Sequence, residues 1–203
     1  MNIMSTNPFL KSIVDANEYV RDCTSNKAKD AHSLSSLVDR SMSQSDCIKL
    51  GTGLEKVFKD IVVARNPGLT NIKPQNTKGK KERDHLFVNE ATKTVFYAEL
   101  KSNLNLDTEK CRSTSSKCVQ IAAELVEEYP GYTIKMYLLG LRYFNKSIVP
   151  KIITNKYTEI AENLVGVNDY FEELGLAGSA HLFEDEPTYR EFLNYVANQM
   201  FDA

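Results

Sequence analysis

Apolar residues in the first third of the chain recur every three to four positions, the spacing of a helix with one buried face. The pattern is clearest in residues 43–68, a long amphipathic run that is ended by Asn66-Pro67-Gly68. The apolar face of this predicted helix consists of Leu50, Leu54, Val57, Phe58, Ile61 and Val62. Residues 8–44 have a weaker helical period and predict two further helices.

In the middle of the chain the pattern changes from helical to extended. Residues 84–101 hold two runs rich in Phe, Val and Tyr, joined by the polar sequence NEATK, and this order predicts a β-hairpin. A short strand is expected before the hairpin, at 69–73, followed by a loop with Pro, Asn and Gly. Residues 132–141, YTIKMYLLGL, predict a strand apolar enough to lie in the centre of a sheet.

Helices are predicted after the hairpin and after the last strand. The first covers residues 115–131 and is ended by Pro130-Gly131. Its expected buried face consists of Val119, Ala122, Ala123 and Val126. The rest of the chain is expected to be helical, closing with residues 187–201, where Pro187 suits a first turn. This order predicts an α/β fold with a central mixed β-sheet flanked by helices, because a helix between two strands permits a parallel crossover.

The length of 203 residues favours a single domain over 1–203, with a helical N-terminal region at about 1–45. No run approaches the roughly 18 apolar residues of a membrane span, and the N-terminus lacks an export signal. We therefore expect a cytoplasmic protein that does not act in a membrane. Four cysteines without C-x-x-C spacing and three scattered histidines argue against zinc.

Charge is distributed unevenly along the chain. Residues 155–203 hold two basic and ten acidic side chains, whereas residues 1–154 hold 23 basic and 17 acidic ones. The net charge of −2 alone argues against a strongly nucleic-acid-binding surface. The chain is nevertheless polarised, with a basic front section and an acidic tail section, and a solvated acidic helical face is the alternative explanation of this asymmetry.

Charged side chains stand at the end of the second hairpin strand, where an isolated charge among apolar residues would be costly. Side chains on a strand alternate between its faces, so Glu99 and Lys101 are expected to project from the same face. If the hairpin turns in NEATK, Asp84 falls opposite residues 98–100. Two carboxylates and one ammonium group are therefore expected to converge.

Two carboxylates held close together repel each other unless a cation joins them, and oxygen ligands without histidine suit Mg²⁺. We therefore expect a magnesium site at Asp84 and Glu99, facing a cleft. Lys101 is expected to orient or help deprotonate an attacking water and to neutralise the transition state of phosphodiester hydrolysis. The alternative is a surface salt-bridge cluster on a hairpin.

Asp84, separated by fourteen residues from Glu99-Leu100-Lys101, resembles the PD-(D/E)XK nuclease motif on its strand hairpin. Arg83 stands where that pattern often has proline. An E-x-K triplet arises about once by chance in a chain of this length, so the surrounding strands carry the resemblance. It implies a restriction-endonuclease-like fold in which Asp84, Glu99 and Lys101 are catalytic and Mg²⁺ is the cofactor.

The same resemblance suggests further site residues. Glu55, on the helix at 43–68, corresponds to the additional acidic residue that many of these nucleases place near the metal; a surface pair with Lys59 is the alternative. The basic loop before the hairpin could follow a phosphate backbone or be merely solvated, and amides and cations after it could contact DNA. The residues expected to bind DNA are Lys78, Lys80, Lys81, Arg83, Asn103, Asn105, Lys110, Arg112 and Lys117.

The resemblance implies a type II restriction enzyme of prokaryotic or phage origin, which hydrolyses double-stranded DNA at a specific sequence and leaves 5′-phosphate ends. Because one active site cuts one strand, a homodimer on a palindromic duplex is expected, with the N-terminal helices in its interface. Two alternatives remain open. One is a repair, resolvase or phage-type nuclease of the same fold, and the other is a non-catalytic interaction domain.

Overall fold

The computed structural model of the chain describes residues 7–23, 38–40, 42–72, 82–176 and 182–202. The chain divides into two compact units, of which the first combines residues 1–61 with 177–203 and the second is Val62–Leu176. This division is finer than the single domain expected over 1–203, which stays a prediction. Among the described residues, no helix is both long and apolar enough to cross a bilayer.

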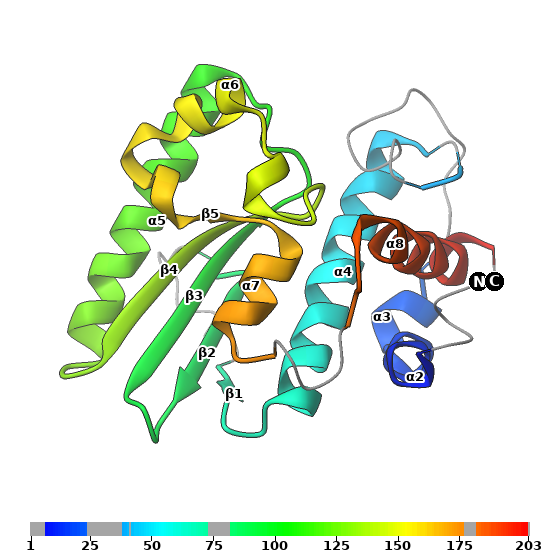
Figure 1. The fold of residues 1–203 in the computed structure, drawn as a ribbon, viewed down its shortest axis with the longest axis horizontal. Coiled ribbons are helices and arrows are strands. Elements are labelled where there is room, and N and C mark those ends of the chain that lie inside the picture. The colour runs from blue at the N-terminus through cyan, green and yellow to red at the C-terminus, as the bar shows by residue number, and fades with distance from the viewer. Residues whose placement is uncertain (1–6, 24–37, 41, 73–81, 177–181, 203) are drawn as a thin grey trace. The chain divides into compact units, whose positions relative to one another are not determined.

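The second unit is built on a five-stranded mixed sheet with helices packed against it, which confirms the predicted α/β class (Figure 1). The first three strands are antiparallel neighbours, and the last three are parallel neighbours. In both spatial and chain order the strands are β1 (Thr70–Asn71), β2 (His85–Asn89), β3 (Thr94–Lys101), β4 (Thr133–Gly140) and β5 (Leu164–Val165). β4 lies between β3 and β5, an interior position that its apolar sequence predicts, whereas the two-residue β5 was not predicted.

The hairpin of β2 and β3 has the expected turn. Asn89 closes it by accepting a hydrogen bond from the backbone N–H of Thr92 (3.0 Å), and Lys93 takes a positive φ of 50°. The register pairs His85 with Ala98, so Asp84, one residue earlier, lies beside Glu99. The hairpin therefore brings together the two carboxylates that the sequence analysis selected.

One face of the sheet is covered by helix α5 (Thr108–Glu128), which makes the crossover between the parallel strands β3 and β4. The side chain of Asp107 caps its N-terminus by accepting from the backbone N–H of Lys110. The core on this face joins strand and helix residues, including Val95, Tyr97, Leu138, Cys118, Ile121 and Leu125.

The predicted buried face of this helix is wrong. Val119 and Val126 are 47% and 59% exposed, whereas Cys118 and Leu125, one position earlier in each case, are fully buried. The helix is turned so that its larger apolar side chains fill the core and Lys117 reaches the sheet. Small and sulfur-containing residues on this face obscure the apolar stripe in the sequence.

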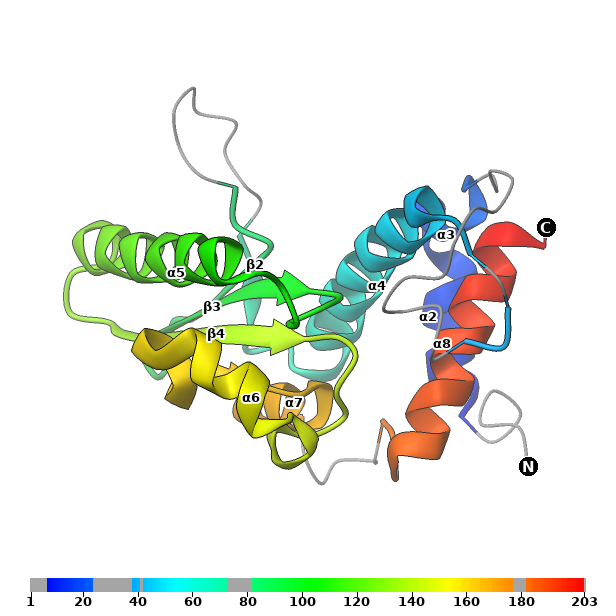
Figure 2. The ribbon, with the colours of Figure 1, turned by 90° about the horizontal axis from the view of Figure 1, so that it is seen from above.

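The opposite face of the sheet carries α7 (Val167–Glu173), and the two helices lie on different sides of the strands in Figure 2. Tyr170, a buried residue of α7, has its hydroxyl 3.0 Å from Nδ1 of His85 on β2. The Tyr170 ring packs edge-on against Tyr137 on β4. Between β4 and β5 the chain forms η1 (Lys146–Ile148), α6 (Lys151–Thr154) and η2 (Asn155–Asn163). η2 also packs against α5.

The first unit is helical. Its described elements are α2 (Pro8–Ala16), α3 (Glu18–Arg21), α8 (Glu186–Phe201) and most of α4 (Gln44–Arg65), which continues into the second unit. Phe58 of α4 stacks on Phe192 of α8, with ring centroids 6.2 Å apart. The helices predicted in 43–68 and 187–201 are confirmed, and α4 ends directly before Asn66. Of the predicted N-terminal helical region at about 1–45, residues 1–6, 24–37 and 41 lie outside the described part of the chain.

Candidate active site

Asp84 directly precedes β2, and its carboxylate is tied to the neighbouring strand. Its Oδ2 accepts a hydrogen bond from the backbone N–H of Leu100, at 2.7 Å. Leu100 lies between Glu99 and Lys101 in the chain, so this bond holds Asp84 next to the last residues of β3. The expectation that Asp84 falls opposite residues 98–100 is confirmed.

Glu99 lies on the face of β3 that α5 covers, and its side chain is only 2% exposed. Lys101 Nζ donates to its Oε1 at 2.8 Å. Lys117 Nζ, from α5, lies 2.6 Å from its Oε2, and the Tyr97 hydroxyl donates to the same oxygen at 3.2 Å. Each carboxylate oxygen of Glu99 thus has a cationic partner.

The expectation that Glu99 faces a cleft is therefore wrong for the structure. The charge is tolerated at the end of a buried strand because two ammonium groups and a phenol surround it, which removes most of the cost of leaving water. The two ammonium groups connect it to the surface, since the lysine side chains are 31% and 24% exposed.

Lys101 is a cation in this setting. Burial lowers its pKa, but the charge of Glu99, its hydrogen bond and the charge of Asp84 together outweigh burial, so the pKa of Lys101 is raised above its ordinary value. A group with a raised pKa is a poor base at neutral pH. Of the two roles expected for Lys101, neutralising negative charge fits the structure better than deprotonating water.

No family model, curated protein or solved structure matches the chain. The side chains of the site therefore carry the functional assignment.

Two neutral groups complete the surroundings of Glu99. Burial and the charge of Glu99 raise the pKa of the Tyr97 hydroxyl, so the phenol keeps its proton and donates a hydrogen bond to the carboxylate. Burial, followed by the charge of Glu99, raises the pKa of the Cys118 thiol from 9.0 to about 11. Both groups stay uncharged at neutral pH, so the charge of the cluster is set by its carboxylates and lysines.

Lys117 is the member of this cluster whose role the sequence analysis missed. The structure pairs it with Glu99 and leaves its side chain 24% exposed, and its predicted DNA contact stays a prediction. A signal was present in the sequence: Lys117 follows the buried Thr114 by three positions and precedes the buried Ile121 by four. A lysine in an otherwise buried helical stripe needs an anionic partner, and Glu99 supplies one.

Two other predicted residues form ion pairs of their own, each within one unit. Glu55 lies on α4 in the first unit and pairs with Lys59, which was the structural alternative given for it. Arg83 is 11% exposed and pairs with Glu128 at 2.7 Å and Glu124 at 3.4 Å, so it ties the start of β2 to α5. Its predicted DNA contact remains a prediction.

Four of the remaining residues predicted to bind DNA follow β3 in the chain, and three precede β2. Asn103 Oδ1 accepts from the backbone N–H of Asn105, and Asn105 Oδ1 accepts from Lys156 Nζ at 2.8 Å. Lys110 and Arg112 are exposed on the first turns of α5. The basic loop residues Lys78, Lys80 and Lys81 lie outside the described residues.

Asp84 and Glu99 are the two oxygen donors that a magnesium ion would use at this site, and the ion would have to replace a lysine on Glu99. The described residues contain no group of three or more His, Cys, Asp or Glu side chains arranged as metal ligands. Asp84 and Glu99 offer two carboxylates from neighbouring strands, and Mg²⁺ is commonly held by one or two carboxylates while it keeps several waters. These two residues would hold the ion, and a phosphate oxygen could complete its ligands.

Proposed function

We propose that the protein is a Mg²⁺-dependent endonuclease that hydrolyses phosphodiester bonds in double-stranded DNA. The observation that carries the proposal is the convergence of Asp84, Glu99 and Lys101 at one end of the β2–β3 hairpin. The PD-(D/E)XK resemblance assigns these three residues to catalysis, and a mixed sheet flanked by helices is the fold that the resemblance implies.

Each residue has a chemical part in this proposal. When bound, Mg²⁺ supplies a Lewis acid that polarises the phosphate and lowers the pKa of a bound water. Asp84 and Glu99 supply its protein ligands, and the hydrogen bond from Leu100 N–H fixes the orientation of Asp84. The Lys101 ammonium, anchored on Glu99, provides positive charge for the negative charge that develops on the phosphate.

A type II restriction enzyme is the specific form that we propose. Sequence-specific cutting of both strands requires two active sites on a palindrome, and a homodimer provides them by symmetry. Cytoplasmic location, 5′-phosphate products and DNA contacts from the basic segments belong to this more specific proposal. A repair, resolvase or phage-type nuclease would share the chemistry and differ in its substrate.

The test is digestion of a long supercoiled plasmid with Mg²⁺. We expect cleavage by the wild-type protein, and we expect Asp84→Asn and Glu99→Gln to lower its rate on the order of a hundredfold or more, because each removes a charged ligand while keeping the side-chain shape. Lys135→Met is the matched control. It removes the ammonium group of the ion pair between Lys135 and Glu173, which lies on the other face of the sheet.

The products distinguish the forms of the proposal. Discrete fragments support a restriction enzyme, whereas nicking or a smear supports a nuclease without sequence specificity. Equal rates in wild-type protein and both carboxylate variants would contradict the proposed site. Ca²⁺ in place of Mg²⁺ should allow DNA binding without hydrolysis.

One observation favours the non-catalytic alternative. Glu99 is buried and already has a cation on each oxygen, so the cluster is balanced without a metal. An interaction domain stabilised by this cluster would leave the plasmid intact with Mg²⁺, and its carboxylate variants would change only stability.

A further inference from the structure

Two lysines from different elements converge on one buried carboxylate. Lys101 reaches Oε1 of Glu99 from the same strand, and Lys117 reaches Oε2 from α5. With Asp84 beside them, the four side chains carry two negative and two positive formal charges. A divalent cation that binds Glu99 must compete with ammonium groups that already occupy its oxygens.

This inference rests on the proposed function. We propose that Lys117 is an internal counter-ion that competes with the divalent metal for Glu99, so that the metal binds tightly only when a DNA phosphate is also present. Lys117 acts here as a positioning residue of the metal site, in addition to its predicted contact with DNA.

Lys117, and not Lys101, is the group that the metal displaces. Lys101 is two residues from Glu99 on the same strand and also experiences the negative charge of Asp84. The ion pair that the structure shows for Lys117 is with Glu99, and it spans two elements. Its side chain is 24% exposed, so the ammonium can turn toward solvent or toward a phosphate without crossing the core.

The charge balance explains why metal and DNA depend on each other. Adding a dication to a neutral cluster leaves two uncompensated positive charges in a partly buried site, which is unfavourable. A DNA phosphate offsets part of this charge and offers the released ammonium a new anionic partner. Because coupling between two binding events is reciprocal, the metal raises DNA affinity by the same factor as DNA raises metal affinity.

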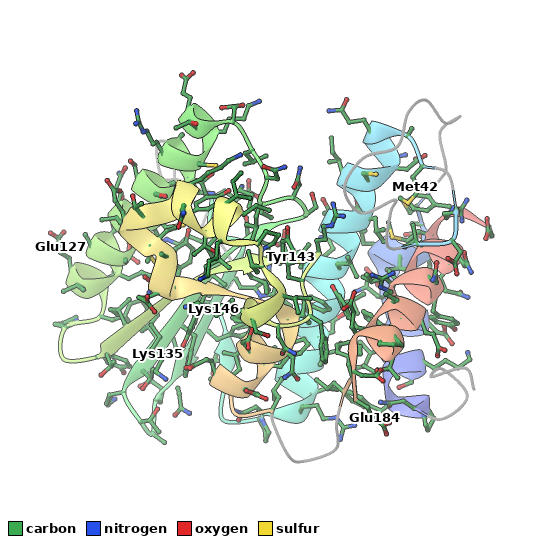
Figure 3. The ribbon with its side chains drawn as sticks, turned by 45° about the horizontal axis from the view of Figure 1, so that its top comes forward. Met42, Glu127, Lys135, Tyr143, Lys146 and Glu184 are labelled. Carbon is green, nitrogen blue, oxygen red and sulfur yellow. The ribbon has the colours of Figure 1, made fainter. Side chains whose placement is uncertain are left out.

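The first measurement is calorimetric titration of Ca²⁺ into the full chain without DNA, so that no cleavage occurs. Lys117→Met removes the competing cation, and we expect it to bind Ca²⁺ about tenfold more tightly than wild type, within the usual range of site coupling. Lys117→Arg retains the charge and should behave as wild type. Lys135→Met, which disrupts an ion pair on the opposite face, is the matched control and should also behave as wild type. Figure 3 shows Lys135 on its strand.

The second measurement is the affinity for labelled duplex DNA of mixed sequence, with and without Ca²⁺, by fluorescence anisotropy. Ca²⁺ should tighten DNA binding by wild type and do so less in Lys117→Met. Circular dichroism checks folding, and Lys117→Gln, which keeps a polar side chain without the charge, replaces the Met variant if that variant unfolds.

The outcomes separate this inference from the proposed function. Equal Ca²⁺ affinity in wild type and the neutral Lys117 variants, with plasmid cleavage intact, would overturn the inference alone. No Ca²⁺ binding by any variant, with or without DNA, would overturn both.

Discussion

At the scale of single residues, the decisive feature is the complete pairing of Glu99. A carboxylate that is 2% exposed would cost several kcal/mol if it stood alone among apolar neighbours. Lys101, Lys117 and Tyr97 offset that cost by direct contacts to both of its oxygens. A buried charge of this kind is stable only as part of its cluster, so its partners are energetically coupled.

This coupling can be measured by a double-mutant cycle between Glu99→Gln and Lys117→Met in urea unfolding. Glu99→Gln leaves Lys101 and Lys117 without their charged partner, and Lys117→Met leaves Glu99 with Lys101 alone. The double variant removes both members of the Glu99–Lys117 pair, so the two effects should not add. We expect an interaction free energy of about 1–3 kcal/mol. Additive effects would mean that the two side chains do not share a stabilising contact.

At the scale of elements, α5 links the site to the core. Its N-terminus is capped by Asp107, six residues after the end of β3. Its middle carries Lys117 to Glu99, and its later turns carry Glu124 and Glu128 to Arg83. These polar contacts and the burial of Ile121 and Leu125 fix the rotation of the helix about its own axis relative to the sheet. The rotation decides which lysine belongs to the cluster.

Two neighbouring substitutions test this rotation. Leu125→Ala should lower the free energy of unfolding by about 2–5 kcal/mol, because it opens a cavity at a fully buried position. Val126→Ala removes an apolar side chain of similar size at a position that is 59% exposed, and should change stability by about 0.5 kcal/mol or less. Chemical denaturation measures both, and the reverse order would contradict the observed helix face.

The elements themselves were largely predictable, because their periods are strong. The hairpin, its register, the long helix α4 and the interior position of β4 all follow from local patterns. β5 was not predicted, because a strand of two residues is too short to show the alternating pattern of a strand. These residues form a strand only through their pairing with β4. The buried face of α5 was not predicted, because adjacent Val and Cys residues could each belong to the apolar face of the helix. Packing against the sheet decides which of them is buried.

At the scale of the whole molecule, buried ionisable groups set the response to pH. Burial raises the pKa of the Tyr97, Tyr170 and Tyr189 hydroxyls, and it raises the pKa of Cys118 to about 11. These groups keep their protons in the folded protein at pH values where the unfolded chain releases them. Both compact units contain such groups.

Stability should therefore be constant up to about pH 9 and fall above it, because the folded state then binds more protons than the unfolded state. Lys101 acts in the same direction, since a raised lysine pKa stabilises the folded protein below that pKa and the effect is lost above it. Cys118 alone contributes about 2 kcal/mol of the loss by pH 11. Urea unfolding from pH 7 to 11 measures the decline, and Cys118→Ala should make it shallower; rising stability above pH 9 would contradict the assignment.

The sequence by itself determined the α/β class, the hairpin and the candidates Asp84, Glu99 and Lys101, because strand alternation and turn position are local properties of the chain. Only the tertiary structure decided the partners of these groups. It placed Lys117 on Glu99, Arg83 on Glu128 and Glu55 on Lys59, and it enclosed Glu99 where an open cleft was expected. Partner choice depends on how a helix is rotated against a sheet, and that rotation is set by packing and desolvation over the whole interface, which no short stretch of sequence encodes.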